Sequence, residues 1–203
     1  LNEAAKSDNN LLCLFLVEPK RLELEDTDPI HIEWELDNAE ELAKSLNEIG
    51  GHLHIKFEDA ITAMQSLHEE YVISRIFSHQ ETGNSWSYQR DIQVKEWCIE
   101  NGVKWMEFAN NGVIRGLVDR DLWKKKRDSR MRIELKPAPQ LGEKSIPLTS
   151  EFKRTSIGLN PRKLTVRREP GELAAIQRLN QFLEDEAKNF QWGISSPVNA
   201  VKY

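Results

Sequence analysis

The sequence is poor in cysteine and in long apolar segments. Its 203 residues include two cysteines, Cys13 and Cys98, too few for a disulfide scaffold and typical of a reducing compartment. The longest apolar run, Leu11–Val17, falls short of the roughly 18 residues that a membrane helix needs. Leu1–Asn10 lacks the basic-then-apolar pattern of a secretory signal. We therefore expect a cytoplasmic, monomeric globular protein without a membrane partner.

Sequence motifs of the common nucleotide and metal enzymes are also absent. The sequence has no GxGxxG, GxxxxGK[ST], HExxH, CxxC or GxSxG, which gives no support for a phosphate loop or a serine nucleophile. His52 and His54 lie two apart with no third ligand nearby, so we expect a surface strand face rather than zinc. Cys98 follows Trp97 inside an expected helix. We interpret it as a core residue, and we predict no metal site and no catalytic residue in this chain.

Charge is distributed unevenly along the chain. The net charge is −5, but Glu18–Glu48 holds eleven acidic and three basic residues, a sum of −8, whereas Arg115–Arg168 holds sixteen basic and six acidic residues, a sum of +10. Two solvated surfaces would explain this split. Alternatively, the basic part lies near an anionic partner such as nucleic acid.

Apolar periodicity predicts alternating strands and helices over the first two thirds of the chain. The expected strands are Leu11–Glu18, His52–Phe57, Val72–Ser78 and Val103–Phe108, and the expected helices are Glu33–Ile49, Asp59–Tyr71, Ser87–Asn101 and Asp121–Ile133. Helices of this length between strands form βαβ units. The prediction is a doubly wound parallel sheet of Rossmann-like α/β class. Leu1–Ser7 has the pattern of the end of a helix, so we expect that a strand preceding it is missing from the chain.

The final third has a different organisation. Lys136–Pro170 contains five of the eight prolines, which excludes a regular helix there and indicates a connector. Glu172–Phe190 then has the apolar spacing of a helix with few partners in the chain. We predict an α/β domain at 1–135, an interdomain connector at 136–170, and the first helix of a truncated all-α domain at 171–203.

The most informative segment is Phe77–Asp91, FSHQETGNSWSYQRD. It follows an expected strand and opens a helix, at the carboxyl edge where open α/β sheets bind ligands. There it offers polar side chains and an aromatic face to a planar ligand, from His79, Glu81, Thr82, Asn84 and Trp86. Arg90 and Asp91 could instead form only a local ion pair near the helix start.

Three segments resemble the amino-terminal α/β domain of the DNA photolyase and cryptochrome family. They are FSHQETGNSWSYQRDIQVKEWC, NGVKWMEFANNGVIRGL and RDLWKKKRDSRM, and the tail PGELAAIQRLNQFL…ISSPVNA resembles the entry to that family's helical flavin domain. The resemblance implies FAD in the helical domain, which splits pyrimidine dimers flipped out of DNA. It also implies an antenna chromophore (a folate, a deazaflavin or a flavin) over the edge of the α/β sheet.

The resemblance implies an antenna site at His79, Glu81, Trp86, Ser87 and Arg90. Family members that bind folate tend to carry an acidic residue just before the RD helix, where this sequence has Trp86 and Ser87. Trp86 either stacks on an antenna or fills its cavity.

DNA contacts are expected from connector residues that would face the DNA, Lys153 and Arg154, together with Arg162 and Lys163. The basic cluster at Lys124, Lys125, Lys126, Arg127, Arg130 and Arg132 could steer DNA, or could be only a solvated helix face.

The leading functional hypothesis is a fragment of a deoxyribodipyrimidine photolyase-like flavoprotein that repairs DNA in light. The alternatives are a cryptochrome blue-light receptor and a nucleotide-binding or electron-transfer α/β module without a DNA role. The family's Ser-x-Leu-Ser-Pro flavin-phosphate segment does not occur after ISSPVNA, and Phe190 stands near a flavin-contacting Tyr of many members. We therefore expect the chain alone to lack FAD binding and repair activity.

Overall fold

The computed structural model describes residues 1–7, 10–110, 112–147, 152–160 and 168–193. The helices are α1 (Asn2–Ala5), α2 (Pro29–Glu48), α3 (Ala60–Tyr71), α4 (Ser85–Glu100), α5 (Trp123–Met131), α6 (Glu172–Gln181) and α7 (Ala187–Gly193). The strands are β1 (Cys13–Val17), β2 (Leu53–Phe57), β3 (Arg75–His79) and β4 (Lys104–Phe108). Short 3-10 turns are η1 (Pro19–Glu23), η2 (Arg120–Leu122), η3 (Gly142–Lys144) and η4 (Arg154–Ile157), and η5 (Phe182–Glu186) is π-helical.

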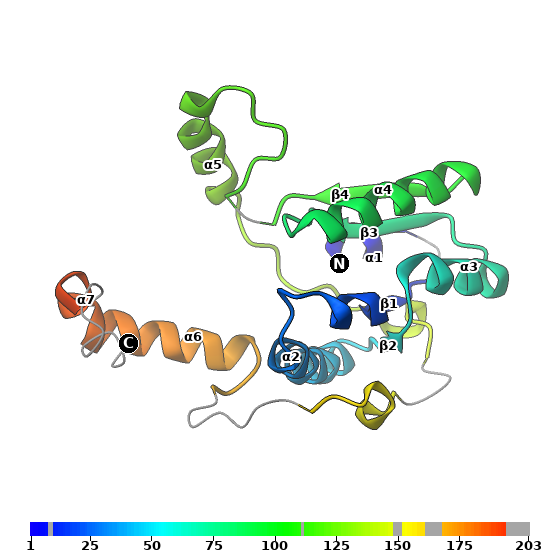
Figure 1. Cartoon of the computed structure of the whole chain (residues 1–203), viewed down its shortest axis with the longest axis horizontal. Coiled ribbons are helices and arrows are strands. Elements are labelled where there is room, and N and C mark those ends of the chain that lie inside the picture. The colour runs from blue at the N-terminus through cyan, green and yellow to red at the C-terminus, as the bar shows by residue number, and fades with distance from the viewer. Residues whose placement is uncertain (8–9, 111, 148–151, 161–167, 194–203) are drawn as a thin grey trace.

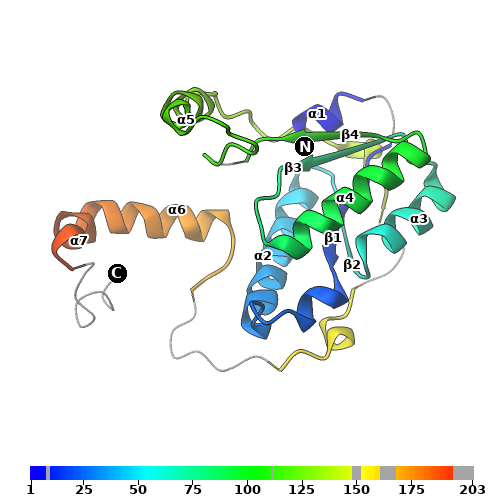
Figure 2. The same ribbon diagram turned by 45° about the horizontal axis from the view of Figure 1, so that its top comes forward.

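The strands form two separate parallel pairs. β1 lies beside β2, with Cys13 opposite Leu53, and β3 lies beside β4, with Arg75 opposite Lys104. The predicted α/β class with parallel strands is confirmed. In the described part of the chain, however, the strands make two two-stranded sheets rather than one continuous sheet, because no ladder joins β1 or β2 to β3 or β4. Figures 1 and 2 show the two pairs standing apart.

Helices cover both faces of the β1–β2 pair. Side chains of a strand alternate between its faces, and in β1 Leu16 packs with the core of α3 and α4, whereas Phe15 and Val17 pack with the core of α2. The α3–α4 core also contacts Ile76 of β3 and Trp105 of β4. This shared core holds the two strand pairs in one α/β body.

Helix α2 begins one turn earlier than the spacing predicted. Asp28 caps it by accepting a hydrogen bond from the Ile30 amide at 3.0 Å, and Pro29 occupies the first helical position, an arrangement that favours a helix start. Ile32 and Leu36 are each only 1% exposed. The apolar spacing of three and four residues in Glu33–Ile49 also predicts Leu42 on the inner face. That prediction is wrong, because Leu42 is 48% exposed.

Helices α3 and α4 match the predicted segments closely. Trp97 and Cys98 of α4 are buried in the core, which confirms the core interpretation of Cys98. The strand expected from Val72 starts only at Arg75. Val72 ends α3 in a left-handed conformation with φ of 52°, so it belongs to the helix end rather than to the strand.

The beginning of the proline-rich segment packs on the β1–β2 pair. Leu141 is buried and its amide donates to the carbonyl of Ile49, while the amide of Leu11 donates to Lys144. His54 lies in the same contact, with Nε2 3.1 Å from the carbonyl oxygen of Ile146. The expected surface position of His54 is therefore wrong. It is 9% exposed, because the connector covers that face of β2.

Helices α5 and α6 project away from the strands (Figures 1 and 2). The predicted carboxyl-terminal helix is present, although π-helical residues interrupt it, and its apolar residues Leu173, Leu179 and Leu183 are more than half exposed. None of the described helices is both long and apolar enough to cross a membrane.

We predict that Leu36→Ala destabilises the protein by about 2–5 kcal/mol, because it leaves a cavity beneath α2. Leu42→Ala is the matched control on the same helix, and its exposed side chain should give a change within about 0.5 kcal/mol. Urea unfolding followed by circular dichroism measures both free energies. Equal losses would show that the described face of α2 is not the one that is packed.

Candidate functional site

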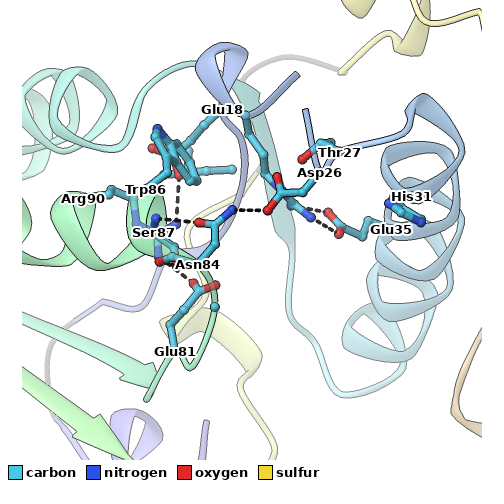
Figure 3. A pocket seen from close by; sticks show the side chains of 13 residues that line it. Glu18, Asp26, Thr27, His31, Glu35, Glu81, Asn84, Trp86, Ser87 and Arg90 are labelled. Carbon is cyan, nitrogen blue, oxygen red and sulfur yellow. Dashed lines mark hydrogen bonds and ion pairs between the residues drawn. The ribbon is translucent and has the colours of Figure 1, made fainter. Parts of the chain in front are cut away.

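A polar pocket lies where the carboxyl end of β1 meets the start of α4 (Figure 3). Its volume is about 380 Å³. The side chains that line it come from β1, the segment after it, α2, the loop before α4 and the first turns of α4: Leu16, Glu18, Arg21, Asp26, Thr27, His31, Glu35, Glu81, Gly83, Asn84, Trp86, Ser87 and Arg90. Ligands of open α/β folds bind beyond the carboxyl ends of strands, which is where this pocket lies.

Glu18, the residue after β1, forms the floor of this pocket. It is 5% exposed, and both of its carboxylate oxygens are engaged. Oε1 accepts from the Ala60 amide at the start of α3 at 3.0 Å, and Oε2 accepts from Arg90 of α4 at 2.9 Å. A buried carboxylate needs such partners to offset its lost hydration. Glu18 therefore joins β1, α3 and α4.

Arg90 gathers three carboxylates around one guanidinium. Besides Glu18, it donates to Glu81 at 2.6 Å and, from two nitrogens, to Asp91 at 3.2 and 2.9 Å. Burial alone would lower the pKa of Arg90, but hydrogen bonds to the three carboxylates outweigh it and raise that pKa. Arg90 therefore stays charged, and its position is fixed from three directions.

The loop before α4 is shaped by a helix cap. Asn84 accepts from the Ser87 amide at 3.1 Å, and the hydroxyl of Ser87 donates back to the Asn84 carbonyl at 3.0 Å. This is the usual satisfaction of a free amide at a helix start. At Gly83 an added Cβ would lie 2.5 Å from the Ser87 hydroxyl. Only glycine fits there without displacing the cap.

The opposite wall belongs to α2 and the segment before it. Arg21 donates to both oxygens of Glu35, to Oε2 at 2.6 Å and to Oε1 as well. Its pKa is raised mainly by that hydrogen bonding. Asp26 accepts from the side-chain amide of Asn84 at 2.8 Å. Figure 3 shows this contact linking the two walls across the pocket.

Trp86 supplies the aromatic surface of the pocket. Its ring centroid lies 5.6 Å from the guanidinium carbon of Arg90, a cation–π distance. Around it stand four carboxylates (Glu18, Asp26, Glu35, Glu81) and two guanidinium groups (Arg21, Arg90), which leaves a formal charge of −2. Such a pocket suits a planar ligand that stacks on the indole and donates N–H groups to carboxylates.

The structure brings together most of the predicted site. Glu81, Trp86, Ser87 and Arg90 all line the pocket. His79 does not: it is exposed and lines an adjoining shallow hollow of about 400 Å³ that shares Glu81 and Gly83 with the pocket. Whether any of these residues binds a chromophore remains a prediction.

Sequence reasoning missed the other wall of the pocket. Glu18 carried a signal, because an acidic residue directly after a buried apolar strand lies at the ligand-binding edge of a parallel sheet. Asp26 and Glu35 had no such signal in the sequence, because they belong to an acidic stretch in which most side chains are expected to be solvated.

The two described connector residues proposed to face DNA differ in environment. Lys153 is exposed. Arg154 donates to Glu40 at 2.6 Å, Asp37 at 2.8 Å and Glu33 at 3.4 Å, so it fastens the connector to α2. Its DNA role stays a prediction and would require these ion pairs to be exchanged for phosphate. Arg162, Lys163 and the ISSPVNA segment lie outside the described residues.

No group of three or more metal-ligating side chains occurs in the described ranges. The acidic groups of the pocket are instead held by arginine and by backbone amides. The pocket also presents no cysteine.

Comparison with protein families gives one match: a family model described as DNA photolyase covers residues 1–118. No curated protein sequence matches the chain at a significant level.

Solved structures resemble the chain in fold. A cryptochrome of Synechocystis sp. PCC6803 superposes with a TM-score of 0.69 and 16% identity, over 95% of this chain and 44% of that one. A bacterial class III photolyase of Agrobacterium tumefaciens superposes with a TM-score of 0.65 and 17% identity, over 91% of this chain and 41% of that one. The chain thus spans less than half the length of either structure.

We predict that Glu18→Gln lowers the free energy of unfolding by about 1.5–3 kcal/mol, because the bond to Arg90 loses its charge in a buried setting. Glu107→Gln is the matched control. It breaks the more exposed Arg115 pair, with a 2.7 Å contact, and should cost at most about 1 kcal/mol.

Urea unfolding of both variants measures the difference. If Glu18→Gln lowered the free energy of unfolding no more than Glu107→Gln does, the contacts of Glu18 with α3 and α4 would not hold these elements together.

Proposed function

The chain belongs to the DNA photolyase family, and from this premise we propose that it is the antenna-binding α/β part of a deoxyribodipyrimidine photolyase-like flavoprotein that repairs pyrimidine dimers in light. The observation that carries the proposal is the Trp86 pocket at the carboxyl edge of β1. Its volume of about 380 Å³ falls in the range of small-molecule sites.

The charge of the pocket supports a particular class of chromophore. A formal charge of −2 disfavours a ligand that carries phosphate into the pocket, because the phosphate would be desolvated beside carboxylates. A pterin-like or deazaflavin ring, with N–H groups for Asp26 or Glu81, is compatible with it. This sequence lacks the acidic residue that folate binders tend to place just before the RD helix, so the carboxylates for such a ring would come from other segments that line the pocket.

The same charge argues against a nucleotide-binding module without a DNA role. Nucleotide sites surround phosphate with backbone amides and cations, whereas both guanidinium groups of this pocket are already paired with carboxylates. We therefore keep that alternative below the photolyase proposal.

We assign residues 1–135 to the antenna domain, 136–170 to the connector, and 171–203 to the start of the helical FAD domain. In this assignment the antenna supplies absorbed light energy to FAD. The residues of this chain hold the antenna: Trp86 stacks on its ring, Arg90 fixes the carboxylates that receive its N–H groups, and the Asn84 cap keeps the loop in place. We place no FAD contact on the described residues.

A cryptochrome photoreceptor is the second candidate, because one structure with the same fold carries that description. A dimer-containing oligonucleotide, incubated with the intact FAD-loaded protein in blue light and in the dark, separates the two. Light-dependent loss of dimers supports repair. Photoreduction of the flavin with every dimer retained would support the receptor and overturn the repair proposal.

We predict that Trp86→Leu weakens binding of a reduced folate or a deazaflavin about fivefold to tenfold, because stacking contributes about 1 kcal/mol. Trp34→Leu is the matched control, since Trp34 lies on α2 and does not line the pocket. Chromophore fluorescence titrations measure both dissociation constants.

The alternative function of Trp86, filling the cavity, predicts the opposite result. The unmodified protein would then bind no chromophore, and Trp86→Leu would create binding. That outcome would contradict the antenna assignment and would leave the family membership untouched.

A further inference from the structure

Helix α5 is a basic element that stands clear of the strands (Figures 1 and 2). From residue 123 to 132 every side chain is exposed or partly exposed, and none is buried. The helix and the residue that follows it carry six cationic side chains: Lys124, Lys125, Lys126, Arg127, Arg130 and Arg132. Core packing does not explain this composition.

One face of α5 is occupied by the loop that precedes it. Trp123, Arg127 and Arg130 lie at i, i+4 and i+7, a single helix face. The indole N–H of Trp123 donates to the Gly112 carbonyl at 3.0 Å, and Arg130 donates to the Val113 carbonyl at 2.5 Å. The guanidinium of Arg127 lies 5.8 Å from the Trp123 ring centroid. These two arginines therefore serve the structure of the loop.

The remaining cations form a second, free set. At 100° per residue, Lys125 and Arg132 project from the side opposite this loop-holding face, and Lys124 and Lys126 project from its two flanks. Asp128, the acidic residue on the free side, pairs with Arg127 at 2.9 Å. Within the described residues, the four free cations have no ion-pair partner.

We propose that these four free cations, Lys124, Lys125, Lys126 and Arg132, which lie around α5 on the sides away from the loop, bind the phosphate backbone of nucleic acid. Lys124 and Arg132 are about 12 Å apart along the helix axis at 1.5 Å per residue, a span that reaches two or more successive phosphates of a strand. Lysine contacts to phosphate position a duplex without reading its sequence. The binding is therefore sequence-independent and sensitive to salt.

The arrangement favours nucleic acid over a membrane surface. A helix that lies in a lipid interface presents a broad apolar face beside its cations. On α5, Trp123 holds the loop and Met131 is the other apolar residue, so no such face exists. This proposal does not rest on antenna binding or on repair, since it places a nucleic-acid contact on the α/β part of the chain.

The test is fluorescence anisotropy of a labelled 20-base-pair duplex of arbitrary sequence, titrated with the 203-residue chain at several salt concentrations. The variant is Lys124→Gln/Lys125→Gln/Lys126→Gln. The matched control is Arg75→Gln/Lys95→Gln/Lys104→Gln, which removes the same charge at exposed positions of β3, α4 and β4. Glutamine and lysine have similar helix propensities, so α5 is expected to persist, and circular dichroism checks it.

We expect the α5 variant to lose about tenfold in affinity at low salt and to lower the slope of log K against log salt by about 0.9 for each lost phosphate contact. The control should keep the unmodified slope. Arg132→Gln, beyond the last helical residue, should give a smaller loss of the same kind.

Three outcomes would overturn the proposal. They are no duplex binding by the unmodified chain, equal losses in the two triple variants, or binding to anionic phospholipid vesicles without binding to the duplex. If the circular dichroism spectrum shows that the α5 triple variant has lost helix, the duplex affinity of Arg132→Gln tests the proposal instead.

Discussion

The ion pair between Glu18 and Arg90 is the contact on which the arrangement of this α/β body depends. Backbone ladders do not connect the β1–β2 pair to the β3–β4 pair in the described chain, so side chains must hold them together. The shared core of α3 and α4 does this without directional preference. Glu18 adds direction, because its two oxygens fix the start of α3 and the first half of α4 relative to the end of β1.

This joint also determines where a ligand could bind. Arg90 contacts Glu81 as well as Glu18, so the loop before α4 is pulled toward the end of β1 and Trp86 is carried with it. The pocket is therefore a consequence of how the two strand pairs are joined. Because a ligand that binds only the folded state stabilises it, occupation of this pocket would strengthen the same joint that forms it.

Local apolar periodicity predicted the positions of the helices and strands to within a few residues. The resemblance of three segments to known sequences indicated the family. Helical spacing predicted the burial of Trp97 and Cys98 correctly. Leu42 has the same kind of spacing but is exposed, because the apolar face of a helix can be wider than the part of it that packs on other elements. His54 was misplaced for a different reason. Its burial depends on a connector residue, Ile146, which lies 92 positions away, and no local pattern reports a contact of that range. The acidic wall of the pocket escaped prediction because Asp26 and Glu35 differ from their solvated neighbours only in their three-dimensional partners.

The charged residues of the sequence fall into two groups: those that pair with other residues of the chain and those that do not. Part of the acidic stretch is neutralised inside the molecule, since Arg154 binds three carboxylates of α2 and Arg21 binds Glu35. On α5, Arg127 and Arg130 are likewise used to hold the loop that precedes the helix. Lys124, Lys125, Lys126 and Arg132 are left without an ion-pair partner among the described residues, because Asp128 pairs with Arg127. Clustered like charges repel one another and destabilise the folded state unless a counter-charge is available. Such a group of cations is consistent with selection for an anionic partner. Contacts with that partner would neutralise these cations, as ion pairs within the chain neutralise the other charged residues.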